Sequence, residues 1–102
     1  MTSDGSPYTR FRRALATGNL NLIRAAAAEL PSVSLGDALA VCVLLRDREP
    51  HRFEQAAVRW LGRLCLERPD LTLADVRAAS FALQRLREDA AGSLKALQEL
   101  AG

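Results

Sequence analysis

The 102-residue sequence is poor in the side chains that carry most enzyme chemistry: it has one histidine, His51, and two cysteines, Cys42 and Cys65. No serine or cysteine lies near His51 in a recognisable nucleophile setting. A metal site needs three or four converging ligands, and these residues do not supply them. The six glycines are scattered, so the sequence has no phosphate-binding glycine loop. We therefore expect no enzymatic activity, no cofactor and no bound metal.

Neither cysteine lies in a CxxC motif or beside a histidine. Both fall within apolar helical patterns, which predicts buried free thiols of the kind that persist in a reducing cytoplasm. The first seven residues have neither the positive charge nor the apolar stretch of a signal peptide. No apolar run approaches the ~20 residues that span a bilayer. We expect a soluble, cytoplasmic protein without a membrane segment.

Residues that favour β-sheets are also scarce, with one isoleucine, five valines and five aromatic residues. Alanine (18), leucine (18) and arginine (13), which all favour helices, make up almost half of the chain. A chain of this length has room for one core. The sequence therefore predicts an all-α fold of five or six short antiparallel helices. We expect a disordered leader over residues 1–7 and a single helical domain over residues 8–102.

Helix-end signals and apolar periodicity locate these helices. Gly18 is expected to end the first helix, and Asn19 to begin the second. Ser34 and Thr72, each followed by an aspartate three residues later, are expected to begin the third and the fifth. The third helix is apolar on nearly all sides, which predicts a central helix covered on more than one side. The predicted helices span about residues 8–16, 20–30, 35–46, 50–67, 73–87 and 90–100.

The boundary between the last two helices has two interpretations. Asp89 and Gly92 indicate a break before the last helix. The alternative is one long helix over residues 73–100, because apolar residues keep a seven-residue step through the break: Val76, Leu83, Ala90 and Leu97. In the first interpretation Leu73 is expected to face inward.

Two parts of the sequence resemble each other at an offset of 38 residues. Residues 29–40 and 67–78 share the pattern E-x-P-x-[VL]-[ST]-L-x-D-[AV]-x-A, which ends one helix and begins another. This predicts repeat units over about residues 11–46 and 53–87, stacked as in α-solenoids. Alternatively, the motif is a general way to begin any helix. Either interpretation predicts antiparallel helix pairs with short connections, in a compact bundle or a short array.

Residues 44–50 read L-L-R-D-R-E-P, and residues 53–62 carry F-x-x-A-A and L-G. This segment resembles the junction of a HEAT-type repeat, in which a helix ends in L-L-x-D and a proline opens the next. Glu54 stands where that family has its repeat arginine. The resemblance implies an array of helical hairpins that serves as a scaffold for protein contacts and has no active site. The Arg, Ala and Leu content also resembles small uncharacterised helical proteins of actinobacterial type, which implies no particular activity.

The formal net charge of +2 is mild, and acidic residues are interspersed with the arginines. Arg52, Arg59 and Arg63 lie on one side of the fourth predicted helix, where they could follow nucleic-acid phosphates. A nucleic-acid-binding regulator is therefore one alternative for the function. The other interpretation is a solvated face supported by local ion pairs, such as that of Arg63 with Glu67. An alternative interpretation is that the basic pI reflects only a GC-rich coding sequence.

An apolar seam in the last helix indicates protein contact. Leu94, Leu97 and Leu100 form this seam, which packs either on the preceding helix or against a second copy in a homodimer. We predict a non-enzymatic adaptor or regulatory module that binds a helical or extended partner segment across a helix-lined groove. Apolar contacts would anchor the segment. The predicted partner-binding residues are Arg52, Arg59, Arg63, Leu94, Leu97 and Leu100.

Overall fold

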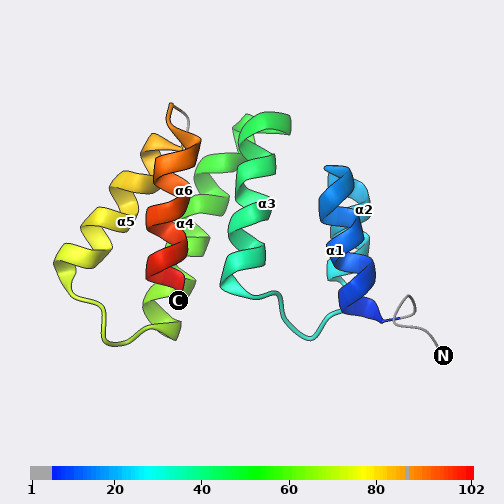
Figure 1. Ribbon diagram of the computed structural model, residues 1–102, viewed down its shortest axis with the longest axis horizontal. Helices are drawn as coiled ribbons and strands as arrows, with labels where there is room; N and C mark the ends of the chain where they lie inside the picture. Colours follow the sequence, from blue (N-terminus) through cyan, green and yellow to red (C-terminus); the bar gives the residue numbers. More distant parts are fainter. Residues whose placement is uncertain (1–5, 87) are drawn as a thin grey trace.

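The computed structural model describes residues 6–86 and 88–102, and this part of the chain contains six α-helices and no strand. The all-α prediction is confirmed. The helices follow one another through short connections (Figure 1). They are α1 (Pro7–Thr17), α2 (Leu20–Ala27), α3 (Leu35–Arg48), α4 (Pro50–Glu67), α5 (Leu73–Arg85) and α6 (Ala90–Ala101).

The first helix begins slightly earlier than the sequence pattern predicts. The Ser6 hydroxyl accepts a hydrogen bond from the Thr9 backbone N–H, and Pro7 occupies the first turn, where its missing N–H costs nothing. Pro7 therefore belongs to α1, and Ser6 caps that helix. The rest of the predicted leader, residues 1–5, lies outside the described residues. Gly18 ends α1 with φ at 70°, a left-handed conformation that favours glycine, as predicted.

The two Ser/Thr-x-x-Asp motifs begin α3 and α5 but use their aspartates differently. At α5 the capping box is complete: Thr72 accepts from the Asp75 N–H, and Asp75 accepts from the Thr72 N–H. At α3 the Ser34 hydroxyl accepts from the Asp37 N–H in the same way. The Asp37 carboxylate accepts instead from Arg12 of α1, at 2.7 Å. The motif at α3 therefore also links α3 to α1.

The break predicted after α5 is present, so the alternative of one helix over residues 73–100 is wrong. α5 ends at Arg85, and α6 begins at Ala90 after the Asp89 side chain accepts from the Gly92 N–H. α2 is shorter than predicted, because it ends at Ala27 instead of residue 30. Asn19 begins it as expected.

The helices pair in chain order as three antiparallel hairpins, α1–α2, α3–α4 and α5–α6. The hairpins lie side by side along the longest dimension of a molecule that measures 47 × 29 × 21 Å (Figure 1). The shared proline motif of residues 29–40 and 67–78 lies at the two connections between hairpins.

α3 lies between two separate hydrophobic clusters. Leu39 and Cys42 belong to the larger cluster, which α3 builds together with α4, α5 and α6. Leu45, with the half-buried Val41 and Leu44, belongs to the smaller cluster, which α3 builds with α1 and α2. The prediction that the third helix is covered on more than one side is confirmed.

Two predicted inward-facing residues are in fact exposed. The core-facing stripe of α4 is Phe53, Ala57, Trp60 and Leu64, and Cys65 lies one residue beyond it, about 100° further around the helix. Cys42 is buried as predicted, but Cys65 is exposed. Leu73 is 90% exposed, because it is the first residue of α5 and precedes the turns that face the core.

Ion pairs connect the first hairpin to the second. Besides the bond from Arg12 to Asp37, Arg24 of α2 donates to the Glu49 carboxylate between α3 and α4, at 2.9 Å. The hydrogen bond from Arg24 lowers the pKa of Glu49 from its usual value. Because both arginines come from the first hairpin and both carboxylates from the second, these pairs fix the register between the two hairpins.

Arginines also connect the second hairpin to the third, but their acceptors are helix ends. Arg46 of α3 donates to the Leu86 carbonyl at the end of α5, and Arg68 after α4 donates to the Leu100 carbonyl in the last turn of α6, each at 2.7 Å. The last carbonyls of a helix receive no hydrogen bond from within the helix, and they carry partial negative charge. A guanidinium therefore satisfies them.

We predict that the leucines of α3 and α4 differ sharply in their contribution to stability. Leu39 is fully buried and Leu66 is 83% exposed. Leu39→Ala should lower the free energy of unfolding by about 2–5 kcal/mol, because it leaves a cavity in the larger cluster. Leu66→Ala should change it by less than about 0.5 kcal/mol. Chemical denaturation of both variants measures this, and equal losses would contradict the described burial.

Candidate functional site

The described residues contain no arrangement typical of a metal centre. Within residues 6–86 and 88–102, no three His, Cys, Asp or Glu side chains lie close enough to hold a metal ion. His51 is exposed in the first turn of α4. Among the described helices, none is long and apolar enough to cross a membrane.

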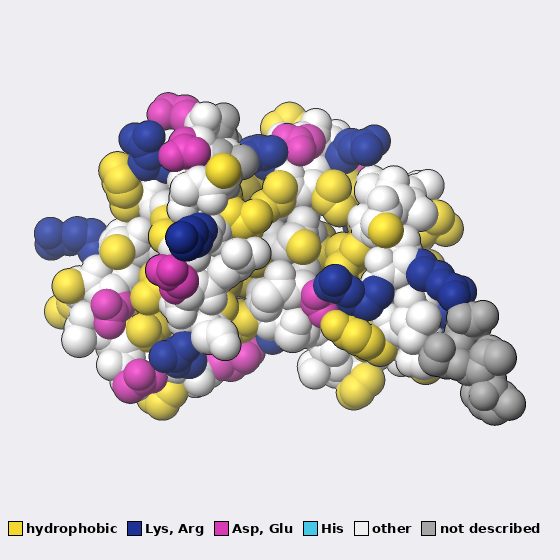
Figure 2. All heavy atoms as spheres, viewed as in Figure 1, with side chains coloured by type: hydrophobic (Ala, Val, Ile, Leu, Met, Phe, Trp, Pro, Cys, Tyr) yellow, Lys and Arg dark blue, Asp and Glu magenta, His cyan; other side chains and the backbone are white. Residues whose placement is uncertain are grey.

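The three predicted arginines lie on α4, and two of them form ion pairs there. Arg52 is 3.2 Å from the Glu49 carboxylate, and Arg63 is 2.7 Å from the Glu67 carboxylate. The pairing predicted for Arg63 is confirmed. Arg59 is exposed between them. On the face shown in Figure 2, basic and acidic side chains are interspersed.

The leucine seam of α6 packs within its own chain. Leu97 is fully buried in the larger cluster, and Leu94 and Leu100 are half-buried against the same cluster. The seam therefore packs against helices of its own chain, which is the first of the two interpretations. Leu97 has no exposed surface to offer a second copy of the chain.

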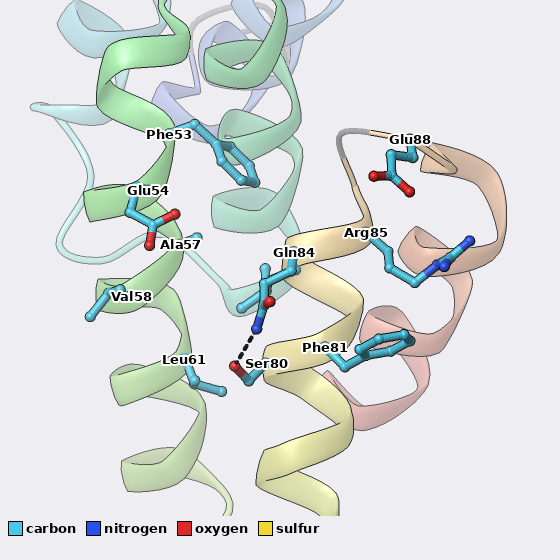
Figure 3. A pocket seen from close by; sticks show the side chains of 11 residues that line it. Phe53, Glu54, Ala57, Val58, Leu61, Ser80, Phe81, Gln84, Arg85 and Glu88 are labelled. Carbon is cyan, nitrogen blue, oxygen red and sulfur yellow. Dashed lines mark hydrogen bonds between the residues drawn. The ribbon is translucent and has the colours of Figure 1, made fainter.

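An open groove lies elsewhere, between α4 and α5 (Figure 3). Its volume is about 630 Å³. The sequence does not single out this pair of helices, and none of the three arginines or three leucines of the predicted site lines the groove. From α4 the groove is lined by Phe53, Glu54, Ala57, Val58 and Leu61, and from α5 and its end by Ser80, Phe81, Leu83, Gln84, Arg85 and Glu88.

The α4 wall of the groove is mainly apolar. Val58 and Leu61 follow Glu54 at steps of four and seven residues, so the three side chains share one face of the helix. Val58 is 62% exposed although it is β-branched and apolar. Phe53, which is 2% exposed, lies deeper on the adjoining face. The wall therefore offers apolar surface to water beside a buried aromatic ring.

The α5 wall is more polar. Ser80 and Gln84 point toward α4 and are joined by a hydrogen bond from the Gln84 amide nitrogen to the Ser80 hydroxyl, at 3.3 Å (Figure 3). Phe81 and Arg85 project from the other side of α5, where the guanidinium lies 5.6 Å from the centre of the ring (Figure 3). Phe81 is still 58% exposed. The groove and the rim of α5 therefore combine apolar surface with groups that donate and accept hydrogen bonds.

Comparisons with known proteins add no assignment, since no family model, no curated protein and no solved structure matches this chain. The function is therefore argued from the groove and from its surroundings.

We predict that the two cysteines differ in reactivity. Burial raises the pKa of Cys42 from its ordinary value of 9.0 to about 11, which keeps the thiol protonated and unreactive at neutral pH. Exposed Cys65 should react alone in the native protein, and both thiols should react after unfolding. A colorimetric thiol titration measures this. Cys65→Ser should abolish the native reaction and Cys42→Ser should leave it unchanged, whereas two reactive native thiols would contradict the described burial.

The raised pKa of Cys42 also predicts a loss of stability in alkali. The folded state holds the thiol proton more tightly than the unfolded state, whose thiol titrates near 9.0. This contribution is complete below about pH 9 and is lost progressively as the pH rises toward 11. Cys42→Ala should remove that part of the pH dependence of unfolding, whereas Cys65→Ala should leave it unchanged.

Proposed function

We propose that this protein is a non-enzymatic interaction module that binds a segment of a partner protein in the groove between α4 and α5. The observation that carries the proposal is the groove itself, with its apolar α4 wall and the exposed apolar side chain of Val58 on that wall. Exposed apolar surface beside a concave site is typical of protein contact.

The dimensions of the groove favour a helical segment as the ligand. Its α4 wall from Glu54 to Leu61 covers about two helical turns, or roughly 11 Å. Two turns of an amphipathic helix present three or four apolar side chains on one face, which suits a groove of this length. Each such side chain contributes about 1.5–3 kcal/mol when it is fully buried.

The arrangement of the hairpins supports the scaffold part of the proposal. Three consecutive hairpins lie side by side, and the shared proline motif lies at both connections between them. We propose on this basis that the array is HEAT-like. A cytoplasmic location is likewise a proposal, supported by the two free thiols.

The predicted arginines take no part in this docking, because none lines the groove. Arg52 and Arg63 already pair with carboxylates at the two ends of α4. These pairs favour the protein-binding module over the nucleic-acid-binding alternative, because an arginine must leave its carboxylate before it can neutralise a phosphate.

The exposed thiol offers a direct test of the groove. Cys65 lies on α4 one turn beyond Leu61 on the same face, so a photocrosslinker attached there extends beside the groove. We expect the labelled protein to form a discrete crosslink in extracts of its source cells. Val58→Asp should reduce the yield at least about tenfold, because it puts a charge on the apolar wall.

Arg59→Ala is the matched control on the other side of α4, and it should leave the yield unchanged. The proposal fails if Val58→Asp crosslinks as well as the unmodified chain. It also fails if added duplex DNA removes the crosslink and the Arg59→Ala variant loses it as well. Those two results together would assign the surface to nucleic acid. Mass spectrometry of the product distinguishes a partner protein from a second copy of this chain.

A further inference from the structure

Most of the described acidic residues of this protein are engaged within the fold. Of the twelve acidic residues, only Asp4 lies outside the described residues. Two others, Asp75 and Asp89, cap helices. Six take part in ion pairs with arginines: Glu29, Asp37, Asp47, Glu49, Glu67 and Asp70.

Three carboxylates remain without an ion pair or a side-chain hydrogen bond to any described residue, namely Glu54, Glu88 and Glu99. Two of the three, Glu54 and Glu88, line the groove between α4 and α5. The lining of the groove therefore contains two carboxylates without an ion pair to a described residue, together with one arginine, Arg85.

Both carboxylates lie toward the same end of the groove. α4 and α5 run in opposite directions, so the first turns of α4 lie opposite the end of α5. Figure 3 shows Glu54 on α4 and Glu88 beyond the end of α5, on the same side of α5 as Arg85. The one described cation in the lining, Arg85, lies beside the Phe81 ring on that side of α5 (Figure 3). The end toward Leu61 is lined by apolar and uncharged residues.

We propose that the ligand of this groove is an amphipathic helix that carries basic residues at one end of its apolar face. The inference rests on the proposed function and adds the charge and the orientation of the bound segment. The apolar face would lie against Val58 and Leu61, and Lys or Arg side chains would reach Glu54 and Glu88. The partial positive charge at a helix N-terminus favours the same orientation, with the first turn of the ligand at the acidic end.

Two synthetic peptides test this proposal. Both are helical, about 15 residues long, and share one leucine stripe; one carries two lysines in its first turn and the other two glutamates. Binding is measured by fluorescence anisotropy at low ionic strength, where exposed ion pairs are least screened. We expect the lysine peptide to bind at least about tenfold more tightly than the glutamate peptide.

Three variants locate the effect. Glu54→Gln combined with Glu88→Gln should weaken the lysine peptide about 3- to 10-fold and reduce the difference between the peptides. Glu99→Gln removes the third unpaired carboxylate, which does not line the groove, and should change nothing. Val58→Asp should weaken both peptides, because it disrupts the apolar wall that both use.

The outcomes separate the two proposals. If the peptides bind equally and Val58→Asp weakens both, the groove binds an apolar helix and the charge inference is wrong. Equal effects of the double Gln variant and of Glu99→Gln would also overturn the charge inference, since they would reflect net charge alone. If neither peptide binds, or if Val58→Asp changes neither affinity, then the groove is not a docking site and both proposals fail.

Discussion

The structure depends on a single helix that must be covered on two sides. α3 is apolar around most of its circumference, and no single neighbour can remove all of that surface from water. α4, α5 and α6 cover one side through Leu39 and Cys42, and the first hairpin covers the other through Leu45. Because the two covering groups lie on opposite sides, the hairpins form a row and not a closed ring, which gives the molecule its length of 47 Å.

The arginine content has a structural explanation within this row. Arg12 and Arg24 of the first hairpin hold carboxylates of the second, and Arg46 and Arg68 of the second hold the terminal carbonyls of the third. Planar guanidinium groups suit both kinds of acceptor, because they present several donors in fixed directions. A basic, arginine-rich composition therefore does not require a nucleic-acid partner.

Local features of the fold could be predicted from the sequence, whereas features that depend on helices packing together could not. The left-handed turn at Gly18 and the cap at Thr72 need only neighbouring residues, and both were predictable. The leucines around Leu97 give the same pattern whether they pack on their own chain or on another, so only the tertiary structure decides between these possibilities. Val58 is a similar case. It is an isolated apolar residue outside the core-facing stripe of α4, and its place in a groove can be recognised only once α5 is known to lie opposite it.

The position of the groove follows from the order in which the hairpins pack. α4 packs closely on α3, and α5 packs closely on α6, so the contact between α4 and α5 joins two hairpins that are each already paired. Apolar side chains pack at both junctions between hairpins, and the junction between the first and second hairpins is also crossed by two ion pairs. The α4–α5 junction has no such described ion pair, and Glu54 is left without a cation there. The carboxylates of the groove therefore form no ion pair with a described arginine of the adjoining hairpin.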